Sequence, residues 1–258
     1  MSVILRRISQ GQLNCLEFCP RKFQYLYFEQ LQSPPNPQQQ EKITWGSQFH
    51  LLMQQRELGL PIDDFLGENE ELEGAINALI KATPEIWLSD SEIWREAEHY
   101  RTLNFDDYLL VVIYDLLVIN NGKAQIFDWK TYLQPENPAK LAQNWQTRLY
   151  QYVLAETTGL APEDISLTYW FVKLPHEPQS VTFKYNLSLH EKTKQDLNNY
   201  FQYLDDWLEN YLQNQEDFPQ VPASQGKCKH CNFAYRCERR QGLLNWDDFV
   251  IDVEEVAI

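Results

Sequence analysis

The stretch Asp115-Leu-Leu-Val-Ile-Asn-Asn-Gly-Lys-Ala-Gln-Ile-Phe-Asp128 places an Asn-Gly pair between two apolar runs. Such a pair is the strongest short-range signal for a β-hairpin, because both turn positions require a positive φ. With Asn121 and Gly122 as the loop, Asp115 lies opposite Asp128 in the predicted register. Their Cβ atoms would then lie about 4.5–5.5 Å apart on one face of the sheet, where like charges repel.

Lys130 follows Asp128 by two residues, so strand alternation returns its side chain to the same face. The apolar run Leu109–Ile113 indicates a strand buried on both faces, where unpaired charges are costly. A divalent cation such as Mg²⁺ or Mn²⁺ would offset the repulsion between the two carboxylates. We therefore interpret Asp115 and Asp128 as metal ligands, the backbone carbonyl of Trp129 as a further ligand, and Lys130 as catalytic. The alternative is a solvent-facing hairpin with an ordinary surface ion pair.

The composition indicates a globular protein of 258 residues, with 43% hydrophobic residues and many aromatic ones. Lys and Arg total 22 against 37 Asp and Glu, a formal net charge of −15. This argues against broad, nonspecific nucleic-acid binding, although a local basic groove and bound divalent ions can still serve a nucleic-acid enzyme. Neither a membrane span nor a signal peptide is predicted, so we expect a cytoplasmic protein whose cysteines are not a disulfide framework.

The order of predicted elements indicates an α/β or α+β fold with a mixed central sheet flanked by helices. Strands are predicted at Glu92–Tyr100, Tyr108–Ile119, Ala124–Thr131, Ser166–Phe171 and Ser180–Tyr185. Helices are predicted at about 9–18, 21–30, 43–57, 70–81, 138–157 and 188–213. The stretch from Ser33 to Gln40 is predicted to be a loop, and Ser188 with Glu191 is predicted to form a capping box.

A histidine and two glutamates on predicted elements can join the acidic face. His50 follows Gly46 by one helical turn, and a neutral imidazole can complete a metal site, although a lone histidine is more often packed or exposed. Glu96 and Glu98 alternate along the strand before the hairpin, and either can contribute a carboxylate. Ordinary surface carboxylates are the competing interpretation for both.

Gln146 and Tyr150 lie one turn apart on the helix that follows the hairpin. Such a face can contact a phosphate or position Lys130. Taken alone, it is typical of any amphipathic helix.

Three cysteines gather near the C-terminal end: Cys228, Cys231 and Cys237. Three thiols within ten residues, in a reducing compartment, indicate a metal or cluster site. A fourth ligand must come from elsewhere, and Cys15 and Cys19 are the candidates. The competing interpretation is a structural zinc ion, with His230 or Cys19 as the fourth ligand.

A set of motifs runs in order from residue 19 to residue 237: Cys19-Pro20-Arg21-Lys22-Phe23, Gly46-x-x-x-His50, Asp115, Asp128-Trp129-Lys130-Thr131, Gln146-x-x-x-Tyr150 and Cys228-x-x-Cys231-x₅-Cys237. Together they resemble the RecB-like branch of the PD-(D/E)xK nuclease superfamily, in particular the iron–sulfur nucleases of AddB type and of CRISPR adaptation. The chain departs from the family pattern at Val112, where a glycine is usual three residues before the first metal aspartate.

The resemblance implies a single restriction-endonuclease-like domain over residues 1–258, with residues 1–30 and 214–240 as a cluster-binding lobe and 241–258 as an acidic tail. It implies a 4Fe–4S cluster on four cysteines: Cys19, Cys228, Cys231 and Cys237. Cys15 is then the spare. It further implies His50, Asp115 and Asp128 as metal ligands and Lys130 as the catalytic lysine.

The implied function is a Mg²⁺- or Mn²⁺-dependent deoxyribonuclease, an exonuclease on single-stranded DNA ends that serves DNA repair. Because the chain has no Gly-x-x-x-x-Gly-Lys-Ser/Thr motif, a helicase would have to come from a protein partner. The alternative is a non-cutting module that bears a cluster or zinc and acts through a protein partner. The net charge of −15 and Val112 favour this alternative, whereas the retained carboxylates and lysine oppose it.

Overall fold

A computed structural model describes residues 6–32, 34–35, 37–67, 69–87, 93–132, 137–174 and 177–239. The predicted acidic tail, 241–258, lies outside the described residues. The chain divides into two compact units. Unit 1 comprises Met1–Ile8 and Asn36–Lys194, and unit 2 comprises Ser9–Pro35 and Gln195–Ile258.

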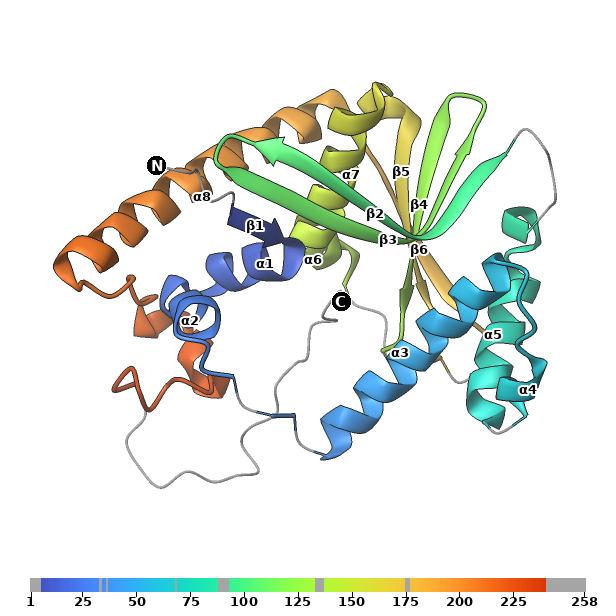
Figure 1. The fold of residues 1–258 in the computed structure, drawn as a ribbon, viewed down its shortest axis with the longest axis horizontal. Helices are drawn as coiled ribbons and strands as arrows, with labels where there is room; N and C mark the ends of the chain where they lie inside the picture. The colour runs from blue at the N-terminus through green and yellow to red at the C-terminus, as the bar shows by residue number, and fades with distance from the viewer. Residues whose placement is uncertain are drawn as a thin grey trace. The chain divides into compact units, whose positions relative to one another are not determined.

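Unit 1 is built on a mixed six-stranded sheet, which confirms the predicted fold class (Figure 1). Its strands are β1 (Arg6–Ser9), β2 (Trp94–Phe105), β3 (Tyr108–Asn120), β4 (Lys123–Lys130), β5 (Ile165–Phe171) and β6 (Gln179–Lys184). The order is β1-β3-β4-β5-β6, and β2 also pairs with β3. The β4–β5 pair is parallel, whereas the β2–β3, β3–β4 and β5–β6 pairs are antiparallel.

The β3–β4 hairpin has the predicted register. Its pairs run from Asn120–Lys123 at the turn to Leu116–Phe127. The two turn residues, Asn121 and Gly122, have φ values of 49° and 73°, as an Asn-Gly turn requires. The regular ladder ends there, one pair short of Asp115 and Asp128.

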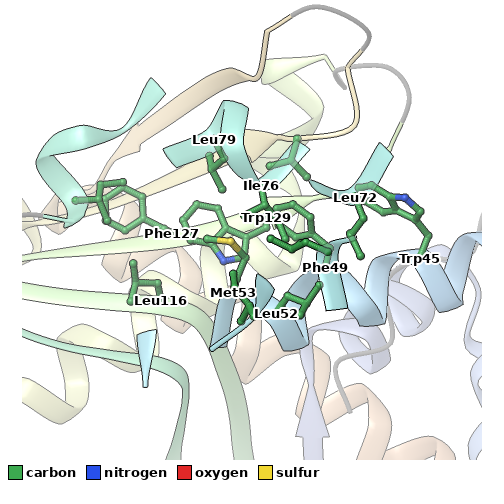
Figure 2. Close-up of a cluster of buried hydrophobic side chains, with 14 of the residues drawn as sticks. Trp45, Phe49, Leu52, Met53, Leu72, Ile76, Leu79, Leu116, Phe127 and Trp129 are labelled. Carbon is green, nitrogen blue, oxygen red and sulfur yellow. The ribbon is translucent and has the colours of Figure 1, made fainter. Parts of the chain in front are cut away.

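The helices of unit 1 are α3 (Pro37–Glu57), α4 (Asp63–Leu66), α5 (Glu70–Ala82), α6 (Pro138–Gln143), α7 (Trp145–Thr158) and the first part of α8 (Leu187–Asn214), with short 3₁₀ turns η2 (Pro84–Trp87) and η3 (Pro162–Asp164). Side chains of α3 and α5 pack with Leu116, Phe127 and Trp129 of the sheet in one buried cluster (Figure 2). Asp128 and Lys130 alternate with these residues along β4 and contact Gln146 of α7 instead. Thus α3 and α7 lie against opposite faces of β4.

The structure corrects three local predictions. Helix α3 begins at Pro37, inside the predicted loop, because proline is well suited to a first helical turn. The predicted helix 138–157 is two helices, since Asn144 has extended backbone and its side chain caps Gln146 N. Helix α8 begins one residue before Ser188, and the Oδ1 of Asn186 accepts from Leu189 N in place of the predicted capping box.

Unit 2 contains α1 (Gln10–Phe18), α2 (Pro20–Phe23), the π-helical segment η1 (Gln24–Phe28), the rest of α8, and the 3₁₀ turns η4 (Ala223–Gln225) and η5 (Lys227–His230). Its N- and C-terminal segments are joined through the buried Gln24. The Gln24 amide donates to Asp217 Oδ1 over 2.8 Å and accepts from Phe218 N over 2.7 Å. Arg21 Nε donates to Phe218 O over 2.6 Å. The predicted helix 21–30 is α-helical only at its start, because the π-helical segment η1 begins at Gln24.

In the described part of the chain, none of the helices has both the length and the apolar character needed to cross a lipid bilayer.

We expect Gly122→Ala to lower the free energy of unfolding by about 1 kcal/mol, because an added Cβ disfavours the left-handed conformation. Nothing lies within 4 Å of the new Cβ, so backbone strain is the sole cause. Urea denaturation measures the change. Lys123→Ala, at the exposed neighbouring position, is the control and should shift stability by under about 0.5 kcal/mol. Equal losses in the two variants would contradict the turn assignment.

Candidate active site

One imidazole and two carboxylates converge in unit 1. His50 comes from α3, Glu98 from β2 and Asp115 from β3, and their ligand atoms all lie within 4.8 Å of one another. His50 Nδ1 is 3.3 Å from Asp115 Oδ1 and 3.9 Å from Glu98 Oε1. All three side chains are partly accessible to solvent, so an ion can reach them.

Glu98 reaches this position through an unusual backbone. The β2–β3 ladder pairs Ala97 with Leu116 and His99 with Tyr114, but the residues between them, Glu98 and Asp115, are not paired. Glu98 has a φ of 50°, which a residue with a Cβ adopts only at a cost of about 1–2 kcal/mol. Strained backbone of this kind concentrates at functional sites, because the surrounding structure has to hold it in place.

Asp115 connects this group to β4. Its Oδ1 faces His50, and its Oδ2 accepts a hydrogen bond of 2.6 Å from the backbone N–H of Trp129. Beyond the end of the regular β3–β4 ladder, the side chain of Asp115 thus serves as the acceptor for a β4 backbone N–H. Lys130 O accepts from Val172 N beyond β5. Since neighbouring residues of a strand direct their backbone groups to opposite sides, the Trp129 carbonyl is directed to the Asp115 side.

Asp128, Lys130 and Gln146 form a second, buried group. The side chains of Asp128 and Lys130 are each 2% exposed, and Lys130 Nζ lies 2.7 Å from Asp128 Oδ1. The Gln146 amide joins both partners: its Nε2 donates to Asp128 Oδ2 and its Oε1 accepts from Lys130 Nζ, each over 2.7 Å. Lys130 Nζ also lies 5.0 Å from the centroid of the Tyr169 ring. These contacts hold the ammonium group in one place, and its burial shields it from bulk solvent.

Tyr150 closes this group from α7. Its hydroxyl accepts from Gln146 Nε2 over 3.3 Å. Burial, then the carboxylates of Asp128 and Asp115, raise the pKa of Tyr150 well above its usual value. The hydroxyl therefore stays protonated at all physiological pH values.

The glycine at position 46 is explained by close packing between α3 and the end of β4. A Cβ on Gly46 would lie 3.1 Å from Oγ1 of Thr131, the residue directly after β4. Its absence lets α3 approach β4 closely, which brings His50, one turn later, to Asp115.

The site residues predicted from the sequence fall into these two groups. His50 and Asp115 lie in the first, and Asp128, Lys130, Gln146 and Tyr150 in the second. Of the two glutamates named as possible members, Glu96 contacts His99 Nδ1 over 2.9 Å instead, and Glu98 is the glutamate at the site. Strand alternation alone does not separate the two glutamates. They differ in the structure because Glu98 lies at the break in the β2–β3 ladder with a positive φ, whereas Glu96 is paired with Leu117.

The donors fit a hard divalent cation. Carboxylate oxygens are the preferred ligands of Mg²⁺ and Mn²⁺, and a neutral imidazole can add one nitrogen ligand. Glu98 and Asp115 repel each other at this distance unless a cation lies between them. Asp128 is not part of the 4.8 Å group, and its two oxygens contact Lys130 and Gln146.

A separate pocket in unit 2 collects four of the five cysteines: Cys19, Cys228, Cys231 and Cys237. Lys22 and Phe233 also line it. Cys15 is buried one turn before Cys19 on α1, and its carbonyl accepts from Cys19 N. Burial raises the pKa of the Cys231 and Cys237 thiols, so metal-free protein carries them as thiols.

A mixed sheet with carboxylates of β3 and β4 and a lysine two residues later is the arrangement of a restriction-endonuclease-like nuclease. Comparison with known families matches residues 7–238 to the PD-(D/E)XK nuclease superfamily. The match covers most of the chain, which therefore belongs to this superfamily. A comparison with curated proteins finds no match.

Two of the solved structures that are similar to the chain illustrate the likeness. One is a protein from Eubacterium rectale named as a candidate exonuclease, with a TM-score of 0.54 and 12% identity over 96% of this chain and 94% of that one. At this identity the likeness shows the fold alone. The other, SSO0001, has a TM-score of 0.40 and 13% identity over 92% and 88% of the two chains.

We expect Glu98→Gly to stabilise the metal-free protein by about 1 kcal/mol, because glycine adopts a positive φ without strain and the repulsion with Asp115 disappears. The same change should weaken Mn²⁺ binding by about tenfold or more. Urea denaturation in chelator and calorimetric Mn²⁺ titration measure the two effects.

The matched control is Glu96→Gly on the same strand. It should lower stability by about 0.5–1 kcal/mol, since glycine weakens a strand, and leave Mn²⁺ affinity unchanged. Equal destabilisation by both variants would show that Glu98 carries no strain.

Proposed function

We propose that this chain is a Mg²⁺- or Mn²⁺-dependent DNA nuclease that hydrolyses phosphodiester bonds. The main support for the proposal is the group formed by His50, Glu98 and Asp115, whose ligand atoms are close enough to bind one cation. It occurs together with the buried network of Lys130, Asp128 and Gln146. Membership of the PD-(D/E)XK nuclease superfamily supports the reaction class.

The metal would be held by His50, Glu98 and Asp115, with Asp128 and the Trp129 carbonyl as further ligands. A divalent cation bound there would supply Lewis-acid activation of water and charge neutralisation at the phosphate. The chain itself supplies an immobile ammonium group on Lys130, oriented by Gln146 and Asp128, for the charge that develops during cleavage.

We propose single-stranded DNA ends as the substrate, cut by exonuclease action in DNA repair, and place the chain in the RecB-like branch. The order of the motifs supports this branch, and the exonuclease name of the similar Eubacterium rectale protein points the same way. With a net charge of −15, the chain needs the bound cation to bring DNA phosphates near its carboxylates. A helicase or another protein partner would present the ends.

We further propose that the four pocket cysteines hold a 4Fe–4S cluster, with residues 1–30 and 214–240 as the cluster-binding lobe of a single nuclease domain. Their common pocket, reached from positions more than two hundred residues apart, supports a shared ligand. A structural zinc ion is the alternative occupant.

A non-cutting module that acts through a protein partner is the second candidate function. The net charge of −15 favours it, as does Val112 in the position usual for glycine, where it is 1% exposed and packed. Against it, a module without catalysis has no reason to keep Glu98 strained or Lys130 buried.

Lys130→Gln should lower the cleavage rate by about 10²–10³-fold, because a fixed positive charge is lost from the site. Glutamine removes the charge but can keep an N–H donor for Asp128, whereas alanine would leave that buried carboxylate with neither a cation nor this donor, at a cost of about 3–5 kcal/mol. The assay uses end-labelled single-stranded DNA with Mg²⁺ or Mn²⁺. Affinity for DNA, measured by fluorescence anisotropy with Ca²⁺, should stay within about threefold of wild type.

The control for this assay is Lys184→Gln, an exposed position on β6, which should cut at the wild-type rate. Full activity of Lys130→Gln would remove Lys130 from the mechanism. If the wild-type chain cuts nothing with any divalent cation, the non-cutting module is the correct function.

Protein purified without oxygen should be brown, with a broad absorbance near about 400 nm, as expected of iron–sulfur centres. Cys19→Ser should lose the colour, and Cys15→Ser, the buried neighbour outside the pocket lining, should keep it. Colourless protein with one zinc ion per chain would decide for zinc. If Cys19→Ser keeps the colour and Cys15→Ser loses it, Cys15 is the fourth cluster ligand and Cys19 is the spare cysteine.

A further inference from the structure

Tyr114 lies directly before Asp115 on β3 and is completely buried. Its hydroxyl donates a 3.0 Å hydrogen bond to the backbone carbonyl of Tyr150. The two rings also contact edge to face, with centroids 5.1 Å apart and planes at 82°. Tyr114, which neighbours Asp115 on β3, is therefore hydrogen-bonded to the backbone of α7.

The Tyr150 carbonyl that accepts this bond belongs to the turn of α7 that completes the proposed active site. Gln146 lies one turn before Tyr150, and its amide contacts Lys130, Asp128 and the Tyr150 hydroxyl. A carbonyl oxygen has two lone pairs, so the Tyr114 bond can be made in addition to the helical one. The height and rotation of this turn on the sheet set where the Gln146 amide lies.

A second contact holds α7 at its far end. Arg101 of β2 donates to Thr157 O over 3.2 Å and to Thr157 Oγ1 over 2.9 Å. The end of a helix presents carbonyls without helical partners, and a guanidinium suits them. Arg101 also contacts His99 Nε2 over 3.1 Å, and the His99 ring stacks on Tyr114 at 6.1 Å.

Both contacts start from the part of β2 and β3 where Glu98 and Asp115 interrupt the ladder. His99 and Tyr114 are the pair that follows the interruption. The strands that carry the metal-binding carboxylates therefore also hold the helix that orients Lys130. Any shift of α7 relative to β3 would change the distance between the two groups of the site.

We propose that Tyr114 is a positioning residue for the proposed nuclease reaction, acting on Lys130 through Tyr150 and Gln146. It is not a catalytic residue, because it is inaccessible to substrate. The inference rests on the proposed function for its kinetic consequence only. The mechanical consequence, a loosened Gln146 turn, follows without it.

Tyr114→Phe keeps the ring packing and removes one hydrogen bond. We expect kcat to fall about tenfold, the rate equivalent of one such bond, while KM for single-stranded DNA stays within about twofold. Tyr185→Phe, another buried tyrosine of unit 1 whose hydroxyl lies near His190, is the control and should keep the wild-type kcat.

A double-mutant cycle separates positioning from a general structural role. In the Gln146→Ala background, Tyr114→Phe should change the single-turnover rate by less than about twofold, because the residue through which it acts is gone. An undiminished tenfold loss in that background would overturn the proposal, as would an equal loss in Tyr185→Phe.

Hydrogen exchange of the amides from 146 to 154 provides a readout that needs no activity. Tyr114→Phe should accelerate exchange in this segment, and Tyr185→Phe should not. Unchanged exchange in Tyr114→Phe would overturn the proposal even if the enzyme cuts DNA. If wild type cuts no DNA but exchange does accelerate, the proposed function fails and the holding role of Tyr114 stands.

Discussion

The contact between Lys130 and Asp128 is the interaction on which the site depends. Two buried charges are tolerable only when good geometry and additional hydrogen bonds offset their lost hydration. Gln146 supplies those bonds to both partners at once, and this requires α7 to lie at one height against β4. The parallel β4–β5 pair, the break at Asn144 and the carbonyl contact from Tyr114 all serve that placement.

The hairpin register follows from local chemistry, since an Asn-Gly pair dictates the turn and the turn dictates every pair after it. The spacing of Gly46 and His50 follows from the need for a helix to approach a strand. Glu98 could not be told from Glu96 in the same way. Its role depends on a backbone conformation imposed by the interrupted β2–β3 ladder, and such non-local strain leaves no periodic signal in the sequence.

The sequence also predicts Asp115 and Asp128 as a facing pair, and the structure gives each its own partners. Asp115 binds the Trp129 N–H and faces His50, whereas Asp128 is engaged by Lys130 and Gln146. The sequence indicates repulsion between Asp115 and Asp128, whereas in the structure the carboxylates that lie together are those of Glu98 and Asp115. Register shows which residues approach each other, but side-chain rotamers and neighbouring helices decide which charges remain to be neutralised.

Unit 2 is assembled from two segments that are far apart in the sequence, and five of the six strands, β2 to β6, lie between these segments. A ribosome therefore releases all six strands before it delivers Cys228, Cys231 and Cys237. The sheet can begin to fold during synthesis, whereas the cysteine pocket and the Gln24–Phe218 contact can form only after the chain has been made as far as Cys237. A metal held by all four pocket cysteines would thus report that the chain has been made at least as far as Cys237, and prematurely terminated products would lack it.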